Sequence, residues 1–109
     1  MDILSAVESL SALAQPTRLR VFQMLVRHEP DGLIAGDIAK LIETPQNTMS
    51  AHLAVLSRAG LITSERRGRQ IIYRASLEGL RQLTVFLIKD CCEARAELCE
   101  PLLAELTCC

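Results

Sequence analysis

The sequence contains no tryptophan, and only three of its 109 residues are aromatic. Proteins that bind single-stranded nucleic acid by base stacking depend on aromatic side chains, so the composition disfavours that class. The chain also lacks an excess of basic residues, because 12 Lys and Arg face 13 Asp and Glu for a net charge of −1. Any contact with DNA must therefore come from a local basic patch.

Long apolar runs are absent as well. None approaches the roughly 20 residues that a membrane span needs, and the first ten residues lack the basic start and apolar stretch of a secretory signal. We therefore expect a cytoplasmic protein with no membrane partner. Half of the residues are hydrophobic and 23% are charged, which predicts a single globular domain over residues 1–109.

Cysteine is missing from the first 90 residues. All five cysteines follow in the last 19 residues, at Cys91, Cys92, Cys99, Cys108 and Cys109. A disulfide framework would distribute cysteines along the chain to close loops, and the cytoplasm keeps thiols reduced. The cluster therefore indicates soft-metal binding or redox chemistry.

Charge is divided between two segments of the chain. Residues 46–74 contain five arginines and one glutamate, whereas residues 90–109 contain five acids and one arginine. The chain thus has a basic middle and an acidic, thiol-rich tail.

The spacing of apolar residues predicts a mainly helical chain. We expect helices over 3–14, Pro16–Arg27, Leu33–Ile42 and Gln46–Ala59, with a turn at Thr44-Pro45 and a C-cap at Gly60. The first helix carries an apolar stripe of Leu4, Val7, Leu10 and Leu13. The second is expected to bury Leu19, Phe22, Met24 and Val26.

The period then changes. Two runs rich in β-branched residues, 61–65 and 70–75, surround Arg66-Arg67-Gly68-Arg69 and predict a β-hairpin. Helical spacing returns at Leu77 and predicts one long helix, interrupted near Cys92 or at Pro101. Its apolar stripe consists of Leu80, Leu83, Leu87, Cys91, Ala94, Leu98 and Leu102. The predicted fold is mainly α with a small β-hairpin, in the order of a winged helix-turn-helix.

That order places short hydrogen-bonding side chains on the fourth helix and basic side chains on the hairpin, as a major-groove reader and a phosphate-binding wing require. Each feature alone is typical of a solvated surface, and the conjunction favours double-stranded DNA. The candidate DNA-binding residues are Gln46, Asn47, Thr48, Ser50, His52, Ser57, Arg58, Arg66, Arg67 and Arg69.

Three segments carry a resemblance to a known family. They read LAQPTRLRVFQMLV at 13–26, SAHLAVLSRAGLI at 50–62 and RRGRQIIYRAS at 66–76. The chain resembles the ArsR/SmtB family of metal-sensing repressors over about residues 8–90. The resemblance implies a homodimer that binds operator DNA when metal-free and releases it when a metal or metalloid binds.

The chain also departs from that family. Many of its arsenic and cadmium sensors carry Cys-x-Cys in the helix before the recognition helix, but residues 37–44 contain no cysteine. His28 and His52 do not complete the zinc site that other members build from Asp and His on the last helix, since that helix has no histidine. The sensing site must then be formed by the C-terminal thiols.

Three thiolates suit the soft metalloids As(III) and Sb(III). We predict Cys91, Cys92 and Cys99 as ligands, and rank Cys108 and Cys109 behind them. Seven residues of unbroken helix would separate Cys92 from Cys99 by ~10.5 Å, so either the helix unwinds after Cys92 or the third thiol comes from elsewhere. Cys91, on the apolar stripe, could instead be a small buried hydrophobe.

The sequence therefore predicts an arsenical-resistance repressor, dimeric through its first and last helices. The expected contacts are Leu4, Val7 and Leu10 with Leu80, Leu83 and Leu87. One alternative is a thiol redox repressor, although acidic surroundings disfavour the thiolate that a peroxide sensor needs. Another is a cytosolic metalloid-delivery protein, which the basic hairpin argues against. No nucleophile–base pair, phosphate loop or carboxylate dyad points to an enzyme.

Overall fold

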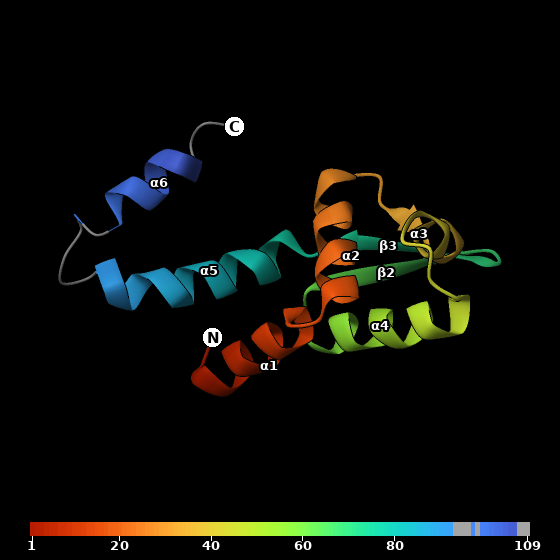
Figure 1. Cartoon of the computed structure of the whole chain (residues 1–109), viewed down its shortest axis with the longest axis horizontal. Coiled ribbons are helices and arrows are strands. Elements are labelled where there is room, and N and C mark those ends of the chain that lie inside the picture. The colour runs from red at the N-terminus through yellow and green to blue at the C-terminus, as the bar shows by residue number, and fades with distance from the viewer. Residues whose placement is uncertain (93–96, 98, 107–109) are drawn as a thin grey trace.

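The computed structural model describes the backbone of residues 1–92, 97 and 99–106, and the side chains of all of these except 90–92. This part of the chain forms six helices and a three-stranded antiparallel sheet of order β1-β3-β2 (Figure 1). The elements are α1 (Ile3–Leu13), α2 (Pro16–Arg27), β1 (Leu33–Ile34), α3 (Ala35–Leu41), α4 (Gln46–Arg58), β2 (Ile62–Arg67), β3 (Gln70–Ala75), α5 (Leu77–Cys92) and α6 (Glu100–Leu106). The predicted winged helix-turn-helix is confirmed, with one added strand.

The molecule is elongated, with extents of 50 × 31 × 24 Å. The β2–β3 hairpin projects from one end, and the N-terminal end of α4 lies at that same end (Figure 1). Helix α5 extends toward the opposite end, where α6 lies along it. None of the described helices is long and apolar enough to cross a membrane.

The helix starts follow local chemistry in the sequence. The Asp2 carboxylate accepts a hydrogen bond from the Ser5 amide at 2.8 Å and so caps α1. The Gln15 side chain does the same for the Arg18 amide at 2.8 Å, and Pro16 occupies the first turn of α2. Each cap satisfies an amide that the helix itself leaves unpaired.

The ends of α3 and α4 share one hydrogen-bond pattern. After α4, Gly60 adopts φ +76°, its amide bonds to the Ser57 carbonyl at 3.0 Å, and the Leu61 amide bonds to the Leu56 carbonyl at 3.1 Å. This is a Schellman motif, as the predicted glycine cap requires. After α3 the left-handed residue is Glu43, at φ 55°. The turn of the helix-turn-helix motif therefore contains a non-glycine residue in an unfavourable backbone region.

The core lies between α2, α3, α4 and the base of the sheet. Its fully buried members include Val21, Leu25, Ile38, Met49, Leu53, Leu56 and Leu61. The predicted face of α2 was wrong by about one residue, because Leu19 is 42% exposed and Val21 and Leu25 are buried instead. Phe22 is buried as predicted, whereas Met24 and Val26 are half-buried.

Strand β1 was not predicted, and residues 33–34 were assigned to a helix. Leu33 pairs with Tyr73 and Ile34 with Ile72, so the strand depends on a partner 38–40 residues away. Gly32 permits the approach, because a Cβ atom there would lie 2.5 Å from the Tyr73 carbonyl oxygen and its φ is +75°. Two residues show no periodicity, which explains why sequence patterns missed the strand.

The C-terminal helix is divided, as one of the two predicted interruptions required. Helix α5 ends at Cys92, and α6 begins at Glu100 with Pro101 in its first turn, where proline favours a helix. Along α5, Leu83 is buried, Leu80 is half-buried and Leu87 is 46% exposed. Ala94 and Leu98 of the predicted stripe lie outside the described residues.

Candidate functional site

The polar side chains of α4 form an exposed surface at the hairpin end of the molecule. Met49, Leu53 and Leu56 face the core, which turns the opposite side of the helix to solvent. The predicted DNA-reading residues Gln46, Asn47, Thr48, Ser50, Ser57 and Arg58 are all exposed. An exposed polar helix with a free N-terminal end has the shape and chemistry to enter the major groove.

His52 differs from its neighbours on α4. Its side chain is half-buried, and ring Nδ1 lies 3.4 Å from Arg18 Nη1. Arg18 Nε also donates to the Ala12 carbonyl at 2.6 Å. The structure therefore places His52 against Arg18, at the junction of α1 and α2.

The three hairpin arginines do not form one uniform surface. Because neighbouring residues on a strand point to opposite faces, Arg66 and Arg67 diverge. Arg66 Nε donates to the Gly68 carbonyl at 3.4 Å, and Arg69 lies in the turn that Gly68 opens with φ +63°. All three are exposed, so each can reach a phosphate from a different direction.

Glu65, the one glutamate of residues 46–74, connects two arginines rather than only opposing their charge. Its Oε2 atom accepts from Arg67 Nε at 2.9 Å, and Oε1 accepts from Arg74 Nη1 at 2.7 Å. Arg74 Nε donates in turn to the Pro30 carbonyl at 2.9 Å. The hydrogen bonds from Arg67 and then Arg74 lower the pKa of the Glu65 carboxyl below its ordinary value, so it is ionised at neutral pH.

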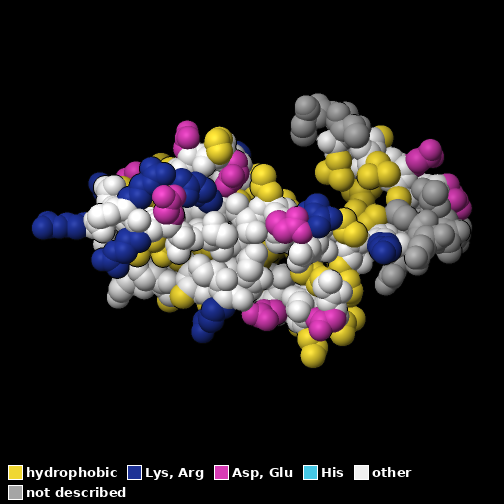
Figure 2. Space-filling model, turned by 180° about the vertical axis from the view of Figure 1, so that it is seen from behind, with side chains coloured by type: hydrophobic (Ala, Val, Ile, Leu, Met, Phe, Trp, Pro, Cys, Tyr) yellow, Lys and Arg dark blue, Asp and Glu magenta, His cyan; other side chains and the backbone are white. Residues whose placement is uncertain are grey.

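Charge and apolar surface occupy opposite ends of one face of the molecule. Lys and Arg side chains gather at the hairpin end, while hydrophobic side chains cover the end formed by α1, α5 and α6 (Figure 2). On α1 the stripe of Leu4, Val7 and Leu10 is 77%, 52% and 41% exposed, and the helix buries Ala6, Ser9 and Ala12 instead. A stripe exposed in the protomer remains available for a partner.

The cysteine segment is described in part. Cys91 and Cys92 form the last residues of α5, but their side chains, and the whole of Cys108 and Cys109, lie outside the described residues. Cys99 is 5% exposed and disulfide-bonded. Its carbonyl accepts from the Leu103 amide at 2.9 Å, which places it directly before α6. Among the described side chains, no cluster of three His, Cys, Asp or Glu could hold a metal.

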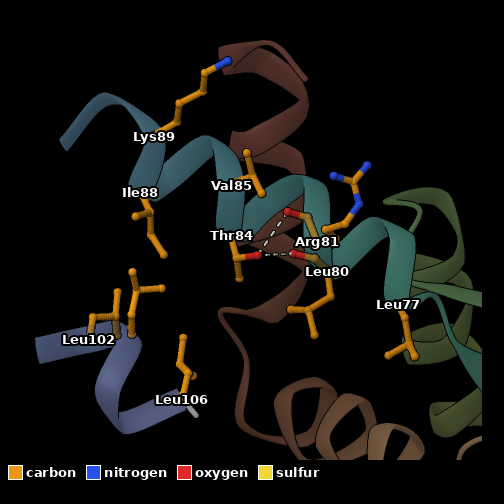
Figure 3. Close-up of a pocket in the computed structure, with 10 residues that line it drawn as sticks. Leu77, Leu80, Arg81, Thr84, Val85, Ile88, Lys89, Leu102 and Leu106 are labelled. Carbon is orange, nitrogen blue, oxygen red and sulfur yellow. Dashed lines mark hydrogen bonds between the residues drawn. The ribbon is translucent and has the colours of Figure 1, made fainter. Parts of the chain in front are cut away.

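An apolar groove of about 680 Å³ lies between α5 and α6. Ile88 of α5 extends toward Leu102 of α6, and Leu77, Leu80 and Leu106 also line the groove (Figure 3). The Thr84 hydroxyl donates to carbonyls of its own helix, Leu80 at 2.9 Å and Arg81 at 3.0 Å. The Thr84 hydroxyl therefore has its hydrogen-bond acceptors within α5. The surface that the groove presents to a ligand is mainly hydrocarbon.

Comparisons with known proteins agree with this geometry. A family described as a helix-turn-helix domain matches residues 13–65. The transcriptional activator HlyU of Vibrio cholerae is 30% identical over 89 residues, which cover 82% of this chain and 80% of HlyU. The solved structure of reduced HlyU, 30% identical, has a TM-score of 0.63 and covers 75% of this chain and 84% of its own.

Two further proteins extend the similarity. The transcriptional repressor SmtB of Mycobacterium tuberculosis is 35% identical over 74 residues, or 67% of this chain and 53% of SmtB. The chain belongs to the ArsR/SmtB family of winged-helix transcriptional regulators. A solved structure described as a possible transcriptional regulator for arsenical resistance is 33% identical, with a TM-score of 0.66, covering 75% of this chain and 82% of the other.

Family membership assigns roles to the elements of this ArsR/SmtB regulator. Helices α3 and α4 are its helix-turn-helix, and β2–β3 is its wing. It is a DNA-binding regulator of transcription rather than an enzyme. Because its relatives include both an activator and a repressor, the fold does not decide the direction of regulation.

Proposed function

We propose that this regulator is a repressor that leaves its operator when As(III) or Sb(III) binds to Cys91, Cys92 and Cys99. The observation that carries the proposal is the restriction of all five cysteines to the segment after residue 90. Of the three predicted ligands, Cys99 is the one whose side chain the structure describes, and it is buried directly before α6. The similarity to a possible regulator of arsenical resistance supports the same effector class.

The donor set fits the chemistry of these metalloids. As(III) and Sb(III) are soft acceptors that form strong bonds to thiolate sulfur, whereas a serine hydroxyl is a poor ligand. Cys99 is disulfide-bonded, so it must be reduced before its sulfur can bind a metalloid. Metalloid binding would join the end of α5 to the start of α6 and thereby change how these helices pack.

The proposal includes a homodimer formed by α1 and α5. The exposed stripe of Leu4, Val7 and Leu10 on α1 and the exposed Leu87 on α5 offer apolar surface at the end away from the wing. The sequence predicts Leu83 at the interface, but it is buried within the protomer and packs inside the fold instead. A dimer would present two copies of α4 to successive major grooves.

Sedimentation tests the dimer. Val7→Glu would bury an unpaired charge at the interface, so we expect a monomer with loss of operator binding. Leu19→Glu, on an exposed leucine of α2 outside the stripe, is the matched control and should remain dimeric. A monomeric Val7→Glu protein with normal operator affinity would contradict two-site binding.

Release of labelled operator tests the effector. A duplex selected by the reduced protein from random DNA is titrated with arsenite, antimonite, cadmium or zinc while fluorescence anisotropy is recorded. We expect arsenite and antimonite to release it. Cys91→Ser, Cys92→Ser and Cys99→Ser should each bind DNA but resist release, and the Cys108→Ser/Cys109→Ser double variant should respond normally. A normal response of Cys99→Ser would exclude it as a ligand.

The disulfide at Cys99 favours a second candidate function, redox control of operator binding. HlyU, a relative, has a solved structure of its reduced form. In such a switch two thiols lose two protons and two electrons to an oxidant such as hydrogen peroxide, which becomes two waters, and a sulfur–sulfur bond forms. Peroxide-driven release that a thiol reductant reverses, in the absence of arsenite, would favour redox control. Release by arsenite alone would favour metalloid sensing.

A further inference from the structure

The acidic residue of the wing lies among the groups that would contact DNA. Glu65 is the single acid in residues 62–75, a segment that also contains Arg66, Arg67, Arg69 and Arg74. Its two carboxylate oxygens are used by different arginines, one by Arg67 and one by Arg74. The carboxylate therefore both lowers the net charge of the wing by one and fixes the positions of two arginine side chains.

The sheet register explains why these three side chains meet. Glu65 and Arg67 are two residues apart on β2 and therefore share a face. Arg74 on β3 pairs with Thr63, which is two residues before Glu65 on that same face. Arg74 is thus a diagonal neighbour of Glu65, within reach of long side chains.

The two arginines differ in how firmly they are held. The Arg74 side chain is 25% exposed and also bonds to the Pro30 carbonyl at 2.9 Å, so it belongs to the scaffold. The Arg67 side chain is 62% exposed, and its Nε atom donates to Glu65 Oε2 at 2.9 Å. Arg74 therefore fixes the carboxylate in place, and the carboxylate holds the solvent-exposed Arg67.

That contact competes with DNA. Arg recognises phosphate best with two parallel N–H groups, and the edge of Arg67 that includes Nε is occupied by Glu65. Phosphate also carries the same charge as the carboxylate. Arg67 can bind a phosphate through Nε only after leaving Glu65, which an exposed ion pair permits when another anion is held nearby.

We propose that Glu65 is a specificity-determining residue that withholds Arg67 from non-operator DNA. On an operator, α4 seated in the major groove keeps a phosphate beside the wing long enough for Arg67 to transfer. On other sequences binding is loosely oriented, and Arg67 stays with Glu65. Because non-specific affinity comes mainly from phosphate contacts, removing one such contact improves discrimination.

Binding of Glu65→Gln to selected operator and to scrambled duplex, each over a series of salt concentrations, tests the proposal. Glutamine preserves size and can still accept from Arg74. We expect a gain of about five-fold for scrambled duplex with a salt slope steeper by about 0.9, the value for one added phosphate contact, and a smaller gain for operator. Equal gains on the two duplexes, or loss of affinity for both, would overturn the proposal.

Two further variants separate release of Arg67 from a change in net charge. In Glu65→Gln/Arg67→Gln the gain on scrambled duplex should vanish, and its persistence would refute competition for Arg67. Glu78→Gln removes an arginine-paired carboxylate from α5 and should change neither affinity. If Glu65→Gln melts at a much lower temperature than the unaltered protein, the single variant Arg67→Gln decides the question. It should weaken binding to operator while leaving binding to scrambled duplex nearly unchanged. Equal weakening would reject the proposal.

Discussion

Arg18 Nη1 in α2 lies 3.4 Å from the ring Nδ1 atom of His52 in α4. The same guanidinium donates to the Ala12 carbonyl at 2.6 Å and to the Ser11 carbonyl at 3.4 Å, both in α1. One side chain therefore connects three helices, and the planar guanidinium supplies donors in several fixed directions at once. The connection joins the recognition helix α4 to both α1 and α2.

We predict that Arg18→Lys lowers both stability and operator affinity. A lysine ammonium has its donors on a single nitrogen, so it cannot reach the three partners that Arg18 contacts through Nε, Nη1 and Nη2. An unsatisfied, partly buried acceptor costs about 1–3 kcal/mol. Urea denaturation and operator anisotropy measure the two effects. Arg20→Lys on the exposed side of α2 is the control and should change neither. Unchanged stability in Arg18→Lys would show that the connection is dispensable.

Arg69 should behave differently from Arg67, because it lies in the hairpin turn rather than beside Glu65. We expect Arg69→Ala to weaken operator and scrambled duplex by similar factors and to lower the salt slope by about 0.9. Titrations over several salt concentrations measure this. Arg27→Ala, which removes one positive charge at the end of α2 and not from the hairpin, is the control. An effect confined to the operator would mean that Arg69 reads bases.

Two glycines with the same sign of φ should respond unequally to alanine. At Gly60 a Cβ atom meets nothing within 4 Å, so Gly60→Ala should cost only the left-handed backbone strain, about 1–2 kcal/mol. At Gly32 the Cβ atom would also lie 2.5 Å from the Tyr73 carbonyl oxygen and disturb β1–β3 pairing. Urea denaturation should rank Gly32→Ala as the more destabilised protein, and the opposite ranking would contradict the packing seen at β1.

Glu78 provides a test in acid. Hydrogen bonds from Arg81 and then Gln82 lower its pKa from 4.5 to about 2. Its folded pKa is lower than its unfolded pKa, so its contribution to stability is present above pH 4.5 and is lost as the pH falls toward 2. Glu78→Gln should flatten the pH dependence of the unfolding free energy in this window, with only a small change at pH 7 because the pair is exposed.

Glu105→Gln on α6 serves as the charge-matched comparison for that measurement. An unchanged slope in Glu78→Gln would show that the Arg81 bonds do not persist in solution.

The element boundaries could be predicted well where single residues dictate backbone geometry. Pro16 opened α2 and Gly60 closed α4, each by a local rule that needs no tertiary partner. The face of α2 could not be predicted as well, because Leu19 and Val21 are both apolar and only the packing of neighbouring helices selects between them.

In the candidate site, too, features set by local sequence could be predicted, whereas contacts between distant residues could not. Exposure of Gln46, Ser50 and the hairpin arginines follows from helix and strand periodicity, and so was accessible from sequence. The contacts of His52 with Arg18 and of Glu65 with Arg74 join residues 34 and 9 positions apart. Such pairs depend on how elements pack or register, which no local pattern encodes.

The distance between the two ends of the protein affects how much effector would be needed to release all operators. Cys99 adjoins α6, whereas the wing tip lies at the other end of a molecule 50 Å long, so the proposed metalloid, if bound at Cys99, could not displace DNA by contact. Such an effector would have to act by favouring a different arrangement of the helices, and coupling of this kind is reciprocal. Operator DNA would then weaken effector binding by the same factor by which the effector weakens operator binding. Regulator molecules away from DNA would capture the effector first, and a cell with additional operator copies would need more effector to switch the last promoter.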